Sequence, residues 1–148
     1  MAKRVLCVCA GNTCRSPMVM VLAQKAFNDQ GIDAVVESCG VIQDLLEGKF
    51  TAANEHSMAM VVEEGLDLST HIPRHVTAVD LQSFDKIVAV TPTIKAKLIE
   101  EFGAPADRLV VLNEHEGGVP DPYELGRAAY VKCIATIKRE LPSLIAQL

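Results

Sequence analysis

One stretch of the sequence decides the fold: Val8-Cys9-Ala10-Gly11-Asn12-Thr13-Cys14-Arg15-Ser16-Pro17. Upstream of its loop, residues 4–9 form an apolar, β-branched run that is typical of a buried strand. Downstream, Pro17 suits the first position of a helix, and apolar residues continue at helical spacing toward Gly31, where we expect the helix to end. The stretch therefore predicts a short loop between a buried strand and a helix.

The rest of the chain repeats this alternation. Further strands are predicted at residues 34–37, 86–90 and 108–112, and helices at residues 51–64, 92–102 and from Asp121-Pro122 onward, with Pro142 as a point where the last helix could kink. Alternating strands and helices predict an α/β fold: a doubly wound, four-stranded parallel sheet with helices on both faces. We expect a single domain over residues 1–148, with ligands beyond the carboxyl ends of the strands.

The composition excludes several classes of protein. Of 148 residues, 49% are hydrophobic and 22% charged, so we expect a folded globule. The net charge of −5, without a basic block, argues against nucleic acid as a partner. Wholly apolar runs such as residues 18–23 fall far below the roughly 20 residues that cross a bilayer, and the first residues lead into a strand rather than a signal peptide. We expect a cytoplasmic protein with no membrane partner.

The cysteines favour reduced thiols. There are five, an odd number, and Cys7, Cys9 and Cys14 are bunched together, which is unlike a secreted disulfide framework. Their spacing lacks a C-x2-C pair and a fourth partner, so no zinc or other metal site is predicted. Cys14 has two open interpretations: a thiol that traps Cys9 as a reversible disulfide on oxidation, or a small buried side chain.

The predicted loop has the chemistry of a phosphate site with a nucleophile. Successive backbone N–H groups at the start of a helix attract an anion, and the helix dipole adds to this attraction. Arg15 can hold two phosphoryl oxygens in parallel, and Gly11 is expected to free the backbone for the turn. The same positive field, with a hydroxyl hydrogen bond from Ser16, favours Cys9 as a thiolate. The predicted phosphate-binding residues are Ala10, Gly11, Asn12, Thr13, Cys14, Arg15 and Ser16.

The sequence resembles the low-molecular-weight protein-tyrosine phosphatase family over essentially its whole length. The resemblance rests on the stretch quoted above, on residues 37–40, on residues 69–71 followed by Arg74, and on the late Asp121-Pro122. It implies a sheet of strand order 2-1-3-4 and hydrolysis of phosphoproteins through a phosphocysteine on Cys9, without a cofactor. Arg15 would then stabilise the transition state, and Asp121 would be the general acid.

Two sets of residues have a structural alternative beside the role that the resemblance implies. Asp121-Pro122 also fits a helix N-cap followed by proline at the first helical position, and the two roles can coexist. By the resemblance, Asn12, Ser38 and His71 form a hydrogen-bond network that holds the loop open. As lone residues, Ser38 would be a turn former and His71 a structural histidine.

The substrate pocket leaves two phosphoryl groups open. Leu45, Leu46, Phe50 and Tyr123 offer apolar walls for a phenyl ring. Thr13 stands where tyrosine-directed members of the family usually carry a branched apolar residue and bacterial protein-arginine phosphatases carry threonine. The acidic residues Asp44, Glu47 and Glu124 could pair with a guanidinium. We place phosphotyrosine first and phosphoarginine as the alternative.

Two more distant functions share the loop. An arsenate reductase of this type needs resolving thiols downstream, and residues 40–132 contain no cysteine. A non-catalytic phosphate-binding module would not need both Cys9 and Asp121. Neither function is preferred.

Overall fold

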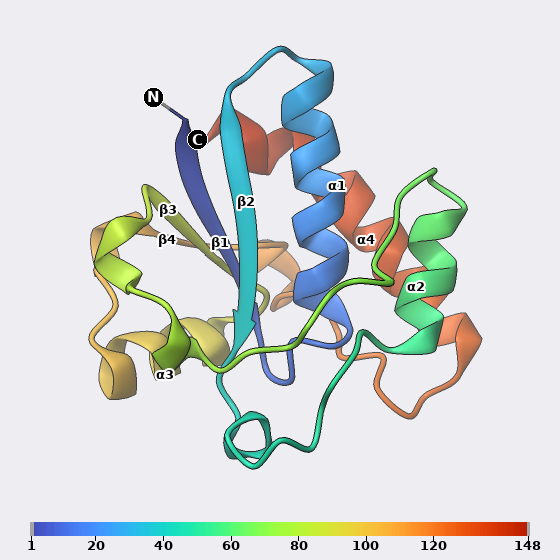
Figure 1. Cartoon of the computed structure of the whole chain (residues 1–148). Coiled ribbons are helices and arrows are strands. Elements are labelled where there is room, and N and C mark those ends of the chain that lie inside the picture. Colours follow the sequence, from blue (N-terminus) through green and yellow to red (C-terminus); the bar gives the residue numbers. More distant parts are fainter. Residues whose placement is uncertain (1, 148) are drawn as a thin grey trace.

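The chain forms one parallel sheet with helices on both faces (Figure 1). In the computed structural model, which describes residues 2–147, four strands lie in the order β2-β1-β3-β4. The strands are β1 Lys3–Cys9, β2 Ala34–Gly40, β3 Lys86–Ala89 and β4 Leu109–Val111. The helices are α1 Arg15–Asp29, α2 Glu55–Val62, α3 Pro92–Phe102 and α4 Arg127–Ala146. The predicted α/β class and strand order are confirmed.

The helices divide unequally between the two faces of the sheet. α1, α2 and α4 pack against one another on one face, whereas α3 packs against β3 and β4 on the other (Figure 1). Because both faces are covered, the central strand β1 is buried continuously from Val5 to Cys9. The core joins all three layers, with Phe27 of α1, Leu98 of α3 and Ile137 of α4 among its buried side chains.

Three element boundaries near the site differ from the prediction. β2 continues to Gly40 instead of ending at residue 37, because it pairs with β1 over its whole length and Gly40 lies opposite Cys9. α2 begins later than residue 51, because the Asn54 side chain caps it by accepting the backbone N–H of His56. α1 begins at Arg15, so Pro17 lies within its first turn, where backbone N–H groups have no helical partner to lose.

The start of the last helix was predicted wrongly. α4 begins at Arg127, with Gly126 as the preceding residue, so Asp121 does not cap it. Glu124 and Gly126 have left-handed φ angles of 63° and 85°, which interrupt any helix begun at Asp121. Pro142 lies inside α4, which continues to Ala146. Within residues 2–147 no helix, α4 included, is long and apolar enough to cross a membrane.

Candidate active site

The loop between β1 and α1 lies at the carboxyl end of the sheet, and we call residues 9–16 the Cys9 loop. The start of α1 is open to an anion: no side chain caps it, and no acidic residue lies in its first turn. α2 and α3, in contrast, have the side chains of Asn54 and Thr91 as caps. The positive end of the α1 dipole therefore faces the Cys9 loop without a competing carboxylate.

Asn12 holds the Cys9 loop in shape. It is fully buried and adopts a left-handed φ of 54°, which asparagine tolerates better than most residues. Its side-chain amide donates to Ser16 Oγ and Ser38 Oγ, both at 2.9 Å, and its side-chain oxygen accepts the backbone N–H of Arg74 at 3.0 Å. Its carbonyl accepts a hydrogen bond from His71 Nε2 at 2.8 Å. The structure thus brings together Asn12, Ser16, Ser38 and His71. It adds the backbone of Arg74, a residue that carries the family resemblance but for which the sequence predicted no role.

Two donors converge on the sulfur of Cys9. The backbone N–H of Asn12 donates to Cys9 Sγ at 3.2 Å, and Ser16 Oγ lies 2.9 Å from the same sulfur. Ser16 Oγ already accepts from Asn12, so its single hydrogen has two acceptors within reach: Cys9 Sγ at 2.9 Å and the Cys39 carbonyl at 3.4 Å. The shorter contact favours Cys9 Sγ. Hydrogen bonds of this kind stabilise a thiolate relative to a thiol.

The other four cysteines are unsuited to nucleophilic attack. All five are free and buried. Burial raises the pKa of Cys7, and it raises the pKa of Cys39 and Cys133 to about 12. Burial also raises the pKa of Cys14, whose sulfur lies 3.1 Å from Tyr130 Oη. These four thiols therefore stay protonated at neutral pH.

Arg15 is a buried cation aimed at the same region. Its guanidinium donates from Nη1 to the carbonyl of Val119 at 2.9 Å, and its Nη2 lies 3.6 Å from Asp121 Oδ2. The side chain is only 7% exposed, whereas that of Asp121 is 52% exposed. A guanidinium has five N–H donors, so one carbonyl at 2.9 Å and one carboxylate at 3.6 Å leave capacity for phosphoryl oxygens.

Asp121 lies on a loop between β4 and α4. Its Oδ1 accepts the backbone N–H of Tyr123 at 3.1 Å, which closes a local turn and fixes the carboxylate beside Arg15. The expected cap role is replaced by this turn. The carboxylate thus comes to the cavity from the segment that follows β4.

These residues surround a cavity of about 80 Å³. Water occupies about 30 Å³ per molecule in the liquid, so the cavity accommodates a group of a few heavy atoms. It is lined by Cys9, Ala10, Gly11, Thr13, Cys14, Arg15, Ile42, Phe50, Asp121 and Tyr123. Among the predicted phosphate-binding residues, Asn12 and Ser16 do not line the cavity; they lie behind it and hold Cys9.

The apolar wall differs from the prediction. Leu45 and Leu46 do not line the cavity, whereas Ile42 and Phe50 do. A short turn of 3-10 helix, Gln43–Leu45, redirects the chain, so that Leu45 lies over Gly40 and Leu46 is 53% exposed. Ile42 was missed because the course of this turn is set by contacts with the Cys9 loop, including the Ile42 N–H bond to the Ala10 carbonyl.

The glycine that the loop requires is Gly40. Gly11 has no left-handed φ, and a Cβ there would make only ordinary contacts, the nearest at 3.5 Å from Phe50. Asn12 makes the left-handed turn that was expected of Gly11. A Cβ on Gly40, in contrast, would lie 2.4 Å from the Ala10 carbonyl oxygen and 3.0 Å from the Asn12 nitrogen. The end of β2 therefore approaches the Cys9 loop too closely for any side chain.

Within residues 2–147, no group of three or more His, Cys, Asp or Glu residues is arranged to hold a metal ion. The chemistry of the cavity is that of a thiol, a guanidinium, a carboxylate and an open helix start. Together these groups are able to bind a phosphoryl group, attack it and protonate a leaving group.

Comparisons with known proteins agree with this geometry. The protein-arginine-phosphatase of Bacillus subtilis (strain 168) is 29% identical over 148 residues, which cover 97% of this chain and 93% of that protein. The low molecular weight protein-tyrosine-phosphatase PtpA of Staphylococcus aureus (strain Newman) is 29% identical over 126 residues, which cover 78% of this chain and 75% of that protein.

A solved structure and a family model extend the likeness to the whole fold. The crystal structure of a low molecular weight protein tyrosine phosphatase from T. tengcongensis matches with a TM-score of 0.88 and 29% identity, and covers 99% of this chain and 100% of that chain. The family model described as low molecular weight phosphotyrosine protein phosphatase matches residues 4–148. With its cysteine and arginine on the loop between β1 and α1, the chain belongs to the low molecular weight phosphotyrosine protein phosphatase family.

Proposed function

We propose that this protein dephosphorylates phosphotyrosyl proteins through a phosphocysteine on Cys9. One observation carries the proposal: Cys9 Sγ, with hydrogen-bond partners in Ser16 and the Asn12 N–H, lies in the same small cavity as Arg15 and Asp121. Family membership supports the reaction class, because the relatives are named as protein phosphatases.

In the first step, the Cys9 thiolate attacks phosphorus, an S–P bond forms, and the bond from phosphorus to the tyrosyl oxygen breaks. Arg15 and the N–H groups at the start of α1 stabilise the equatorial phosphoryl oxygens in this in-line transfer. Asp121, beside Arg15, donates a proton to the leaving phenolate oxygen.

In the second step, water attacks the phosphocysteine. Asp121, now a carboxylate, accepts a proton from that water, and the S–P bond breaks to release phosphate and return the Cys9 thiolate. The Ser16 hydroxyl, 2.9 Å from the sulfur, stabilises the thiolate as it leaves phosphorus.

The walls of the cavity favour an aromatic leaving group. Ile42, Phe50 and Tyr123 line it and offer apolar surface to a phenyl ring. Among the described residues, Asp121 is the one carboxylate in the lining; Asp44 and Glu47 instead lie beside Lys49, and Glu124 does not line the cavity. The guanidinium of a phosphoarginine substrate would therefore find few carboxylate partners in the cavity.

Phosphoarginine remains the second candidate because of Thr13. Its side chain lies in the cavity lining, where a hydroxyl can orient a polar leaving group or water. The B. subtilis relative named as a protein-arginine-phosphatase supports this alternative.

Phosphoproteins are the partner in either case. A cytoplasmic location belongs to the proposal as well, since five free thiols suit a reducing compartment.

Two measurements test the proposal. The Cys9→Ser variant should release no phosphate from an aryl phosphate and should still bind inorganic phosphate, because the guanidinium and the helix start are intact. Substantial turnover by this variant would refute Cys9 as the nucleophile.

To decide between the two substrates, rates on phosphotyrosyl and phosphoarginyl peptides are compared in the wild type and in Thr13→Ile. We expect the phosphotyrosyl peptide to react faster in both; a faster phosphoarginyl reaction that collapses in Thr13→Ile would reverse the order.

A further inference from the structure

The segment between β4 and Asp121 is held by one buried side chain, that of Asn113. This residue is 5% exposed and has a left-handed φ of 59°. Its side-chain amide donates to the Gly118 carbonyl at 2.8 Å. Its own carbonyl accepts the backbone N–H groups of Glu116 at 3.1 Å and Gly118 at 2.9 Å. Residues 113–118, which we call the Asn113 turn, are thus held closed by hydrogen bonds from the side chain and the backbone carbonyl of Asn113.

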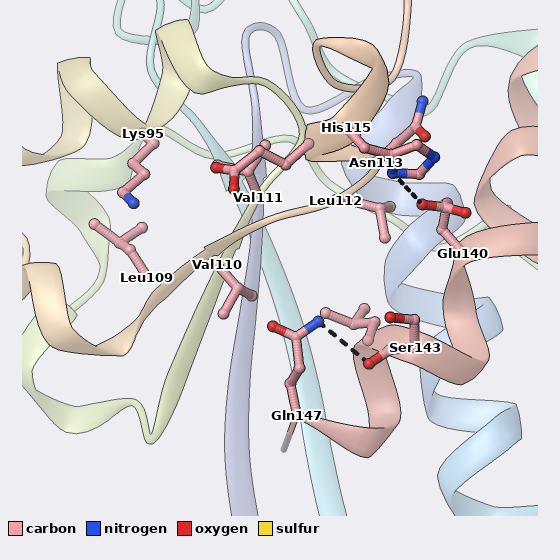
Figure 2. Close-up of a pocket in the computed structure, with 12 residues that line it drawn as sticks. Lys95, Leu109, Val110, Val111, Leu112, Asn113, His115, Glu140, Ser143 and Gln147 are labelled. Atoms are coloured by element: carbon pink, nitrogen blue, oxygen red, sulfur yellow. Dashed lines mark hydrogen bonds and ion pairs between the residues drawn. The ribbon is translucent and has the colours of Figure 1, made fainter.

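The Asn113 turn is also fixed to α4. Arg139 Nη2 donates to Asn113 Oδ1 at 3.1 Å and pairs with Glu116 of the same turn. His115 Nδ1 lies 3.4 Å from Glu140 Oε1, and Figure 2 shows His115 beside Glu140 at the edge of a cavity of about 430 Å³ between β4 and α4. The contact with Arg139 determines the amide orientation, because a flipped amide would aim its N–H groups at a guanidinium.

The Asn113 turn leads directly into the active site. A Cβ on Gly118 would lie 2.6 Å from the Val90 carbonyl oxygen, so this residue is pressed against the end of β3. The next residue, Val119, donates its N–H to the Val90 carbonyl at 2.7 Å, and its carbonyl accepts the Arg15 guanidinium at 2.9 Å. Asp121 follows two residues later, 3.6 Å from Arg15.

We propose that Asn113 is a positioning residue for both Arg15 and Asp121, acting through its hydrogen bond to the Gly118 carbonyl. The inference rests on the proposed phosphatase function and assigns a role outside the Cys9 loop. Without this bond the Gly118–Val119 peptide keeps the Val119 N–H bond to the Val90 carbonyl but loses the anchor on its carbonyl side, so the peptide tilts and the Val119 carbonyl shifts with it. The Arg15 guanidinium then loses an acceptor that is held in one position. The segment that leads to Asp121 loses its anchor. A misplacement of about 1 Å can lower a rate by about a hundredfold.

The test uses Asn113→Gly and Asn113→Asp. Glycine adopts the left-handed φ without strain and removes both side-chain hydrogen bonds. Aspartate retains an acceptor for Arg139 but cannot donate to the Gly118 carbonyl. The control is Gln24→Ala: the Gln24 side chain likewise bridges two backbone groups, donating to the Ala34 carbonyl and accepting the Val36 N–H, but at the outer edge of β2.

Two readouts separate positioning from stability. The first is the ratio of kcat/KM between phenyl phosphate, whose leaving group needs a proton, and dinitrophenyl phosphate, whose leaving group does not. The second is the affinity for inorganic phosphate, measured by calorimetry. We expect kcat/KM of both Asn113 variants to fall about tenfold on phenyl phosphate and less than about threefold on dinitrophenyl phosphate. Their affinity for inorganic phosphate should fall about three- to tenfold. Gln24→Ala should lower thermal stability without changing the kcat/KM ratio or the phosphate affinity.

Equal losses on both esters with unchanged phosphate affinity would overturn the proposal, as would wild-type behaviour of Asn113→Asp. If the wild type hydrolyses neither ester, the proposed function fails. The phosphate titration still decides the role of Asn113 in that case, because it requires no turnover.

Discussion

Cys9 depends on a side chain that does not line the cavity. Asn12 donates its backbone N–H to the sulfur and its side-chain amide to Ser16 Oγ. The second bond turns the Ser16 hydrogen away from Asn12. Of its two remaining acceptors, Cys9 Sγ at 2.9 Å is nearer than the Cys39 carbonyl at 3.4 Å. One residue therefore sets both hydrogen bonds that stabilise the thiolate.

At the same scale, Asp121→Asn tests the general acid. An amide keeps the size of the carboxyl group and can still accept the Tyr123 N–H, but it cannot give a proton to a leaving group. We expect kcat/KM on phenyl phosphate, which reports the transfer to Cys9 and not the later hydrolysis, to fall by about 10²- to 10³-fold, and kcat/KM on dinitrophenyl phosphate to fall far less. Steady-state kinetics with the two esters check this. Equal losses on both would mean that Asp121 acts through Arg15 and not through a proton.

The sequence predicted those site residues whose roles depend on neighbours within one short segment of the chain. Cys9, Arg15 and Ser16 follow from one strand-loop-helix pattern, and the structure places all three around Cys9 Sγ or the cavity. Gly40 and the Val119 carbonyl could not be found this way. Their importance comes from close approaches between segments far apart in the chain, which no local pattern reports.

At the scale of elements, the end of β2 and the Cys9 loop form one unit. The backbone N–H groups of Val41 and Ile42 both donate to the Ala10 carbonyl, at 2.9 Å and 3.2 Å. Because β2 pairs with β1 along its full length, Gly40 lies beside Cys9. The path of the loop therefore depends on the register between these two strands.

Gly40→Ala tests this dependence. Its Cβ would lie 2.4 Å from the Ala10 carbonyl oxygen, and backbone cannot yield as a side chain does. We expect a loss of about 1–3 kcal/mol in the free energy of unfolding and a fall of about a hundredfold in kcat/KM. Urea unfolding and aryl phosphate kinetics measure the two. Gly11→Ala is the comparison: its Cβ makes ordinary contacts and should lower both quantities less. A larger effect at Gly11 would contradict the assignment.

The predictions for whole elements were right where periodicity is strong and wrong where a turn intervenes. The four strands and four helices follow from runs of apolar residues that any buried strand or amphipathic helix shows. The start of α4 was missed because Asp121 and Pro122 carry a cap pattern, while Glu124 adopts a left-handed φ that its residue type does not signal. Likewise, because of the turn at Gln43–Leu45, Ile42 takes the place predicted for Leu45 and Leu46 in the cavity wall, while Phe50 lines the cavity as predicted.

At the scale of the whole molecule, the site is assembled from segments on both sides of β1. Ser38 comes from β2, His71 and Arg74 from the segment after α2, and Asp121 from beyond β4. Parallel strands bring their carboxyl ends to one edge, which lets these segments meet the Cys9 loop. The stability of the fold and the shape of the loop are therefore linked, and His71 provides a way to measure that link.

Burial lowers the pKa of His71 below its ordinary value of 6.5, and the charge of Arg74 adds to this effect, while the hydrogen bond to the Asn12 carbonyl opposes it. The unfolded chain therefore binds a proton at His71 more readily than the folded chain. Stability from the neutral imidazole is complete above pH 6.5 and decreases as the pH falls through 6.5 toward the lowered pKa.

The His71→Gln variant tests this dependence, because glutamine can still donate to the Asn12 carbonyl but does not titrate. We expect the free energy of unfolding of the wild type, measured in urea, to drop relative to that of His71→Gln between about pH 7.5 and 5.5. The other histidines are present in both proteins, so a constant difference across this range would mean that His71 is not held neutral by the fold.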